Sequence, residues 1–183
     1  MPTVFSHAAV PLAIAYVAGR RAVSGRLLAA GAACSMLPDA DVIGLAFGVP
    51  YGSTWGHRGA THSLAFALLA GAAGALASRR LRARAGVAFA FLAAAAASHG
   101  LLDMLTDGGR GVAWLWPLAA ERFAAPWRPI AVSPIGVRSI ATEYFAHVLR
   151  SELLWIWLPA LAASAAGGAL ARRARRGRVI VRP

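Results

Sequence analysis

The chain has 183 residues, a length that fits a single domain. Hydrophobic residues make up 58% of it and charged residues only 14%, whereas soluble domains are about 25% charged. The composition therefore excludes a disordered chain and argues against an ordinary soluble enzyme. The net charge of +12 comes entirely from arginine. The arginines separate hydrophobic stretches, as the positive-inside rule predicts for a membrane protein, so we expect no nucleic-acid partner.

Five hydrophobic segments follow one another along the chain, at about residues 4–19, 27–49, 63–78, 86–105 and 153–171. Arginine-rich stretches follow the first, third and fifth segments, which places these connections in the cytoplasm. We therefore predict an all-α, polytopic membrane bundle of about five spans, with the N-terminus outside and the C-terminus inside.

One membrane-embedded domain is expected to occupy residues 1–171, followed by a basic cytoplasmic tail at 172–183. Residues 106–152 connect the last two segments on the outer side. Their glycines, prolines and tryptophans predict a lid of short helices and turns at the membrane interface. The single cysteine, Cys34, excludes an intrachain disulfide.

Ionisable side chains interrupt the outer ends of four segments. They are His7, Asp39, Asp41, His57, His62, His99, Asp103 and Asp107. A helix rises about 1.5 Å per residue. On this scale, the groups in the first four segments lie about 17–24 Å above the cytoplasmic end of their own segment. The side chains are thus expected at one level in the outer half of the bilayer, where ionisable groups are functional by default.

A metal ion is the favoured explanation for this convergence. His99 and Asp103 are four residues apart and share one helix face, and Pro38 is expected to break the second segment at Asp39. Taken singly, each histidine or aspartate is more often a hydrogen-bonding partner than a ligand. Together they suit Zn, Mn or Fe, and more than one ion if six or more ligands converge. The strongest predicted ligands are Asp39, Asp41, His62, His99 and Asp103, followed by His7 and His57.

Several sequence blocks resemble one protein family. They are Ser-His near the N-terminus, Leu-Pro-Asp-Ala-Asp, His-Arg-Gly-Ala-Thr-His-Ser, His-Gly-Leu-Leu-Asp-Met-Leu-Thr, and Trp-Leu-Trp-Pro followed by Glu-Arg-Phe. They resemble the LexA-regulated, metal-dependent hydrolases of the bacterial inner membrane, from residue 7 to about residue 134. The resemblance implies that the metal site consists of His7, Asp39, Asp41, His57, His62, His99 and Asp103. A fainter likeness, in spacing alone, is to zinc-dependent phospholipase C and related nucleases.

These features predict a hydrolase in the lipid bilayer, with its site facing the periplasm. A divalent metal, zinc before manganese or iron, would lower the pKa of a bound water. Asp41 or Asp107 is expected to act as general base, and Arg58 to stabilise charge on a phosphoryl oxygen. The depth of the site suits a phosphoester of a lipid or a lipid-linked substrate.

Two other functions could use the same residues. An ion or proton transporter would need a continuous polar path to the cytoplasm, yet the first, third and fourth segments carry few polar groups below this level. A structural metal site would need closed coordination. Glu143 and His147 are also four residues apart, but a surface pair is the favoured interpretation there. The sequence leaves the oligomeric state open.

Overall fold

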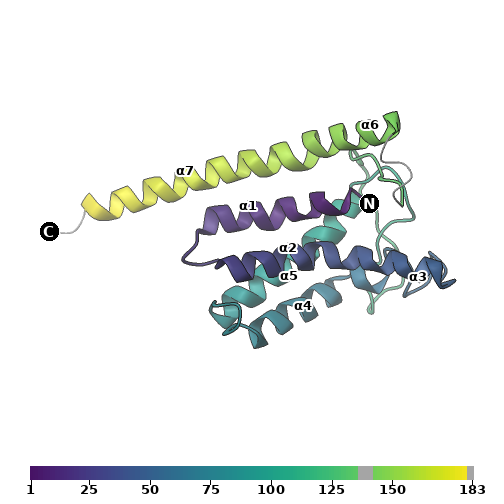
Figure 1. Ribbon diagram of the computed structural model, residues 1–183, viewed down its shortest axis with the longest axis horizontal. Helices are drawn as coiled ribbons and strands as arrows, with labels where there is room; N and C mark the ends of the chain where they lie inside the picture. The colour runs from purple at the N-terminus through teal and green to yellow at the C-terminus, as the bar shows by residue number, and fades with distance from the viewer. Residues whose placement is uncertain (136–141, 181–183) are drawn as a thin grey trace.

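The computed structural model describes residues 1–135 and 142–180. Helices form most of these two ranges, and no β-strand occurs within them, only two isolated bridges. The helices, drawn in Figure 1, are η1 (Val4–Ala8), α1 (Ala9–Ala18), α2 (Gly25–Met36), η2 (Leu37–Val42), α3 (Ile43–Ala46), η3 (Ala60–His62), α4 (Leu64–Leu76), α5 (Ala85–Met104), α6 (Glu143–Glu152), η5 (Leu153–Trp157) and α7 (Leu158–Ile180).

Three helical stretches are long and apolar enough to cross a membrane: Gly25–Ala46, Ala85–Met104 and Glu143–Arg173. Two shorter apolar helices, Val4–Ala18 and Leu64–Leu76, lie with them in the bundle. The predicted all-α membrane bundle is therefore confirmed. The number of spans and the orientation stay predictions.

Hydroxyl side chains set the start of several helices. Ser24 accepts a hydrogen bond from the Leu27 N–H at the first turn of α2, and Ser63 accepts one from the Phe66 N–H at the first turn of α4. Thr142 caps α6 in the same way. Each cap satisfies a backbone donor that the helix leaves open.

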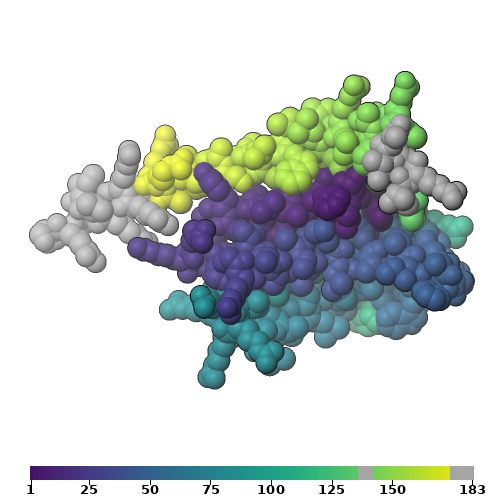
Figure 2. Space-filling view, viewed as in Figure 1, coloured from purple at the N-terminus to yellow at the C-terminus, as the bar shows by residue number. Residues whose placement is uncertain are grey.

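Small residues bring the helices close together. A Cβ at Gly71 of α4 would lie 2.9 Å from Ala93 Cβ and from the Phe89 carbonyl of α5, so this crossing requires glycine. Figure 2 shows α1 lying between α2 and α7. A buried apolar cluster joins α2 to the first half of α5; it contains Val23, Leu27, Ala88, Phe91 and Leu92.

The described part of residues 106–152 contains turns and the helix α6, the kinds of element expected of the predicted lid, and its place at the membrane interface stays a prediction. Residues 106–135 form turns, with isolated bridges between Thr106 and Ile130 and between Val112 and Phe123. The last long helix begins at Glu143, ten residues before the predicted fifth segment, and it continues to Ile180 within the predicted tail. The remaining parts of the lid and the tail, residues 136–141 and 181–183, lie outside the described residues.

Candidate metal centre

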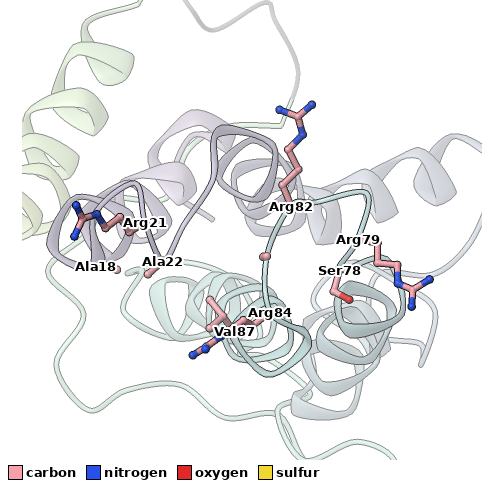
Figure 3. A pocket seen from close by; sticks show the side chains of 9 residues that line it. Ala18, Arg21, Ala22, Ser78, Arg79, Arg82, Arg84 and Val87 are labelled. Atoms are coloured by element: carbon pink, nitrogen blue, oxygen red, sulfur yellow. The ribbon is translucent and has the colours of Figure 1, made fainter.

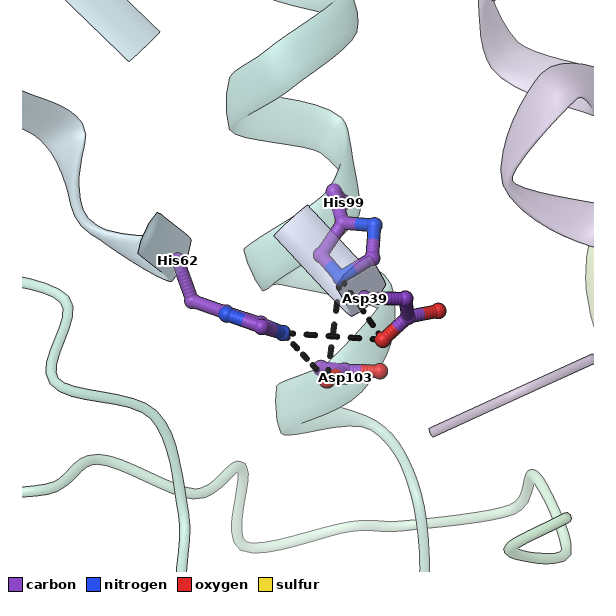
Figure 4. A group of neighbouring side chains, drawn as sticks. All are labelled: Asp39, His62, His99 and Asp103. Carbon is purple, nitrogen blue, oxygen red and sulfur yellow. Dashed lines mark ion pairs between the residues drawn. The ribbon is translucent and has the colours of Figure 1, made fainter. Parts of the chain in front are cut away.

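Four buried side chains meet where η2, η3 and α5 come together (Figure 4). They are Asp39, His62, His99 and Asp103, and one ligand atom from each lies within 4.8 Å of the others. His62 Nε2 is 3.4 Å from Asp103 Oδ2, and His99 Nε2 is 3.4 Å from Asp39 Oδ1. We call this group the central quartet.

The local sequence explains how the quartet assembles. Helix α5 places His99 and Asp103 one turn apart on the same face. Pro38 opens the 3-10 turn η2, which carries Asp39 inward. A Cβ at Gly100 would lie 2.7 Å from the His62 carbonyl, so glycine at this position lets the η3 turn approach α5.

His7 lies beside the central quartet, and its Nε2 faces the second oxygen of each of the two carboxylates. Its ring stacks on that of His99, with the centroids 3.8 Å apart and the planes at 17°. His7 Nε2 is 3.6 Å from Asp39 Oδ2 and 3.9 Å from Asp103 Oδ1. Each carboxylate therefore presents one oxygen to the quartet imidazoles and the other toward His7. Figure 4 shows the second oxygens of Asp39 and Asp103 pointing to the same side.

Most polar atoms of this region have no hydrogen-bond partner. In the described ranges, nine buried side-chain nitrogen and oxygen atoms lack a hydrogen bond, and all belong to the quartet, His7 or Arg58. Two of the nine, Arg58 Nε and Asp103 Oδ2, form an ion pair with each other. Leaving a buried polar group unpaired is costly, so such a concentration needs an explanation. Imidazole nitrogens and carboxylate oxygens are the donors that Zn, Mn and Fe accept. The residues therefore fit a divalent cation.

Hydrogen bonds behind the quartet fix the orientation of its imidazoles. His99 Nδ1 donates to the Ser35 carbonyl at 2.7 Å, so Nε2 carries the free lone pair. On the other side, Asp41 accepts from His57 Nδ1 and from the Thr61 hydroxyl, both at 2.7 Å. Asp41 Oδ2, which accepts from Thr61, also lies 3.3 Å from His62 Nδ1. Such partners set the tautomer and the ring direction of a metal ligand.

Asp41, His57 and His62 form a second group that could hold a cation. His62 belongs to both groups, through Nδ1 to Asp41 and through Nε2 to the central quartet. Burial alone would lower the pKa of His62, but the carboxylates of Asp103, Asp39 and Asp41 raise it to about 10. The three carboxylates therefore favour the protonated form of the His62 imidazole.

Arg58 lies buried against the quartet, with only 1% of its surface exposed. Its Nε forms an ion pair with Asp103 Oδ2 at 3.1 Å, and its two terminal nitrogens donate to the Gly108 carbonyl and the Thr106 hydroxyl, each at 2.8 Å. The residue also has a φ of 63°, in the left-handed region. The guanidinium group predicted to hold a phosphoryl oxygen is thus engaged with the protein.

The remaining predicted residues lie outside both groups. Asp107 is exposed, and its carboxylate accepts a hydrogen bond from the Val132 N–H at 2.8 Å. Glu143 and His147 are exposed near the start of α6, and in the described part of the chain no ion pair joins them.

One residue near the site was missed by the sequence analysis. Glu152 is buried and accepts hydrogen bonds from the Thr3 and Ser6 hydroxyls, each at 2.6 Å, so it ties α6 to the turn that carries His7. The signal in the sequence was a single acidic residue, Glu152, close to Leu149, Leu153 and Leu154. Arg110 lines a cavity of about 420 Å³ together with Tyr51 and His57.

Comparison with known proteins agrees with this membrane architecture. The sequence matches the YdjM inner membrane protein family over residues 1–174. Inner membrane protein YbcI of Escherichia coli (strain K12) is 48% identical over 163 residues, which cover 88% of this chain and 94% of that protein. No solved structure matches the chain. The resemblance to an inner-membrane family and the predicted bacterial inner-membrane location are confirmed, and the chain belongs to the YdjM inner membrane protein family.

Proposed function

We propose that this protein is a metal-dependent hydrolase that acts on a phosphoester of a lipid or lipid-linked substrate at the periplasmic face. The buried imidazole nitrogens and carboxylate oxygens that lack a hydrogen bond carry the proposal. Inside a membrane protein, such atoms are tolerable when they coordinate an ion or pair with one another. The imidazole–carboxylate separations among them are 3.4–4.0 Å, longer than direct hydrogen bonds, which leaves room for coordination.

The central quartet would hold one divalent ion, with zinc favoured and manganese or iron as alternatives. A second ion would be held by His7 with the other oxygens of Asp39 and Asp103. His7 Nε2 lies 3.6 Å from Asp39 Oδ2 and 3.9 Å from Asp103 Oδ1, which supports this second position. Three protein ligands at the second position would leave room for water or substrate.

A bound divalent metal supplies a water of lowered pKa and polarises a phosphoryl oxygen. The protein's own residues would orient the ligands and move the proton. His57 lines the outer cavity and is held by Asp41, so this pair is the proposed general base. The exposed Asp107 is less suited to that role. Arg58 would hold Asp103 in place, and Arg110 would contact the phosphoryl group.

The shape of the outer surface supports an amphiphilic substrate. The cavity that contains His57 and Arg110 shares Met1 and Ser133 with a second cavity of about 530 Å³. The second cavity is mostly apolar; its wall includes Val4, Phe5, Phe145, Leu149, Leu153 and Trp157. A polar headgroup would therefore fit beside the site while its apolar tail lies against α6.

The distribution of charge supports a periplasmic site. The arginine-rich α1–α2 and α4–α5 connections lie together at one end of the bundle, and residues 105–135 cover the other end (Figure 1). Positive connections favour the cytoplasm. Between the arginines and the quartet lies the apolar cluster of Leu27, Phe91 and Leu92, which disfavours a proton or ion pathway.

Metal analysis tests the proposal. Purified full-length protein, reloaded with zinc, is expected to contain stoichiometric metal by plasma mass spectrometry. His99→Ala should lose it, while His147→Ala, the matched control at an exposed histidine, should keep it. The same samples are then assayed for phosphate or phosphorylated headgroup release from phospholipid in mixed micelles.

Three results would each contradict a different part of the proposed function. Absence of metal in the reloaded wild type would overturn the metal site. Full metal content without turnover of any lipid phosphoester would favour the structural site over the hydrolase. Equal metal content in wild type and His7→Ala would overturn the second ion position alone.

A further inference from the structure

A basic cavity lies at the end of the bundle opposite the central quartet, between the α1–α2 and α4–α5 connections (Figure 3). Its volume is about 590 Å³. Four arginines line it, together with small and apolar side chains. The arginines are Arg21, Arg79, Arg82 and Arg84. We call this hollow the basic cavity.

No carboxylate balances the charge of the basic cavity. Neither residues 19–26 nor residues 77–85 contain an aspartate or glutamate. Across the described ranges, none of the four lining arginines forms a hydrogen bond or an ion pair through its side chain, and all four are exposed. Four like charges around one hollow repel one another and attract an anion.

The two connections are tied together, so the rim of the cavity is fixed. The Ser24 hydroxyl donates to the Leu81 carbonyl, and the Arg26 guanidinium donates to the Arg80 carbonyl at 3.1 Å. Between these contacts and α5, Arg82 adopts a φ of 52°. A residue with a side chain rarely occupies this left-handed region unless its surroundings impose it, and such residues cluster at functional positions.

We propose that the basic cavity binds the phosphate of an anionic phospholipid headgroup from the cytoplasmic leaflet. Arginine guanidinium groups bind phosphate through paired hydrogen bonds. Basic pockets between transmembrane helices on the cytoplasmic side are suited to anionic lipid headgroups. The apolar wall of Ala18, Ala22 and Val87 suits the glycerol and the first acyl carbons. The proposal does not depend on hydrolase activity.

Lipid binding would require the arginines to turn inward. In Figure 3 the side chains of Arg21, Arg79, Arg82 and Arg84 point in different directions around the rim. Because their side chains form no hydrogen bond or ion pair in the described residues, rotation about the side-chain bonds breaks none. A phosphate placed in the hollow would offer the acceptors that these guanidinium groups lack.

Native mass spectrometry of the full chain from nanodiscs tests the proposal. The discs contain equal amounts of phosphatidylglycerol and phosphatidylcholine, and the retained lipid is identified. Arg82→Gln/Arg84→Gln is expected to reduce retention of phosphatidylglycerol roughly tenfold. Arg172→Gln/Arg173→Gln, which removes the same charge from α7 outside the cavity, is expected to change it much less. Unchanged thermal unfolding of both variants, followed by tryptophan fluorescence, would show that the fold is kept.

A second arm separates a lipid from a free anion. Inorganic phosphate at millimolar concentration is added to the wild type before lipid retention is measured. Retention of phosphatidylglycerol despite the added phosphate supports the lipid assignment. Displacement by phosphate would assign the cavity to a free phosphate and overturn it. Equal lipid loss in the two double variants would show general surface attraction and overturn the site itself.

Discussion

The buried guanidinium of Arg58 provides a direct test of how the Asp103 carboxylate is held. Arg58→Met keeps most of the volume of the side chain and removes its charge. The ion pair to Asp103 at 3.1 Å and the hydrogen bonds to Thr106 and Gly108 at 2.8 Å are all lost. Removing one partner of a buried pair costs about 3–5 kcal/mol of the free energy of unfolding. We expect a loss of that size in metal-free protein.

The loss should depend on metal. A divalent ion in the central quartet would also neutralise Asp103, so the cost of Arg58→Met is expected to be smaller in zinc-loaded protein than in chelator-treated protein. Thermal unfolding of the purified protein in detergent, followed by tryptophan fluorescence with zinc and with chelator, measures both values. An equal cost in the two conditions would show that metal and Arg58 do not share Asp103.

Arg110→Met is the matched control. Arg110 is exposed and, in the described part of the chain, forms no hydrogen bond or ion pair, so its replacement should change stability by no more than about 0.5 kcal/mol. If Arg58→Met proves as harmless as Arg110→Met in metal-free protein, the buried ion pair does not hold the site together.

Three further predictions follow from the packing and charge of the site. Glu152→Ala removes the acceptor that ties α6 to the turn carrying His7; it should cost about 2–4 kcal/mol in chemical unfolding and lower metal content, and unchanged values would contradict this. The three carboxylates around His62 raise its pKa, and the imidazole must lose its proton to bind metal, so zinc binding at pH 7 should release protons and should strengthen as the pH rises. Calorimetry in buffers of different ionisation enthalpy measures this release. Gly71→Ala should cost about 1–3 kcal/mol, because its Cβ would meet α5 at 2.9 Å, whereas Gly86→Ala, with open space around it, should not.

The fold was predictable where hydrophobicity alone decides it. Four of the five apolar segments coincide with helices of the structure, because each is a run of small or apolar residues bounded by arginine or a polar loop. The start of the last helix was not predictable in this way. Helix α6 contains charged residues and is amphipathic, so the continuous apolar run of this helix starts only at residue 153. The Thr142 cap is the local signal for the true start.

The gathering of site residues was predictable from spacing and depth, but their partners were not. The interval between His99 and Asp103 fixes a shared helix face, and the depth argument brings His7, Asp39 and His62 to the same level. Which atoms face one another depends on turns. Arg58, in the loop of residues 51–63, has a φ of 63°, and its side chain is buried. No pattern in the sequence predicts that this side chain points into the protein.

The formal charge of the site residues bears on how many metal ions the proposed hydrolase would hold. Asp39, Asp41 and Asp103 contribute three negative charges and Arg58 one positive charge, so the region carries a net charge of minus two with neutral histidines. One divalent ion would neutralise it, which is the condition that a structural site needs inside a membrane protein. A second ion beside His7 would leave two positive charges at the site. That excess matches the charge of a phosphate monoester, so a phosphoester hydrolase is better served by two ions than by one.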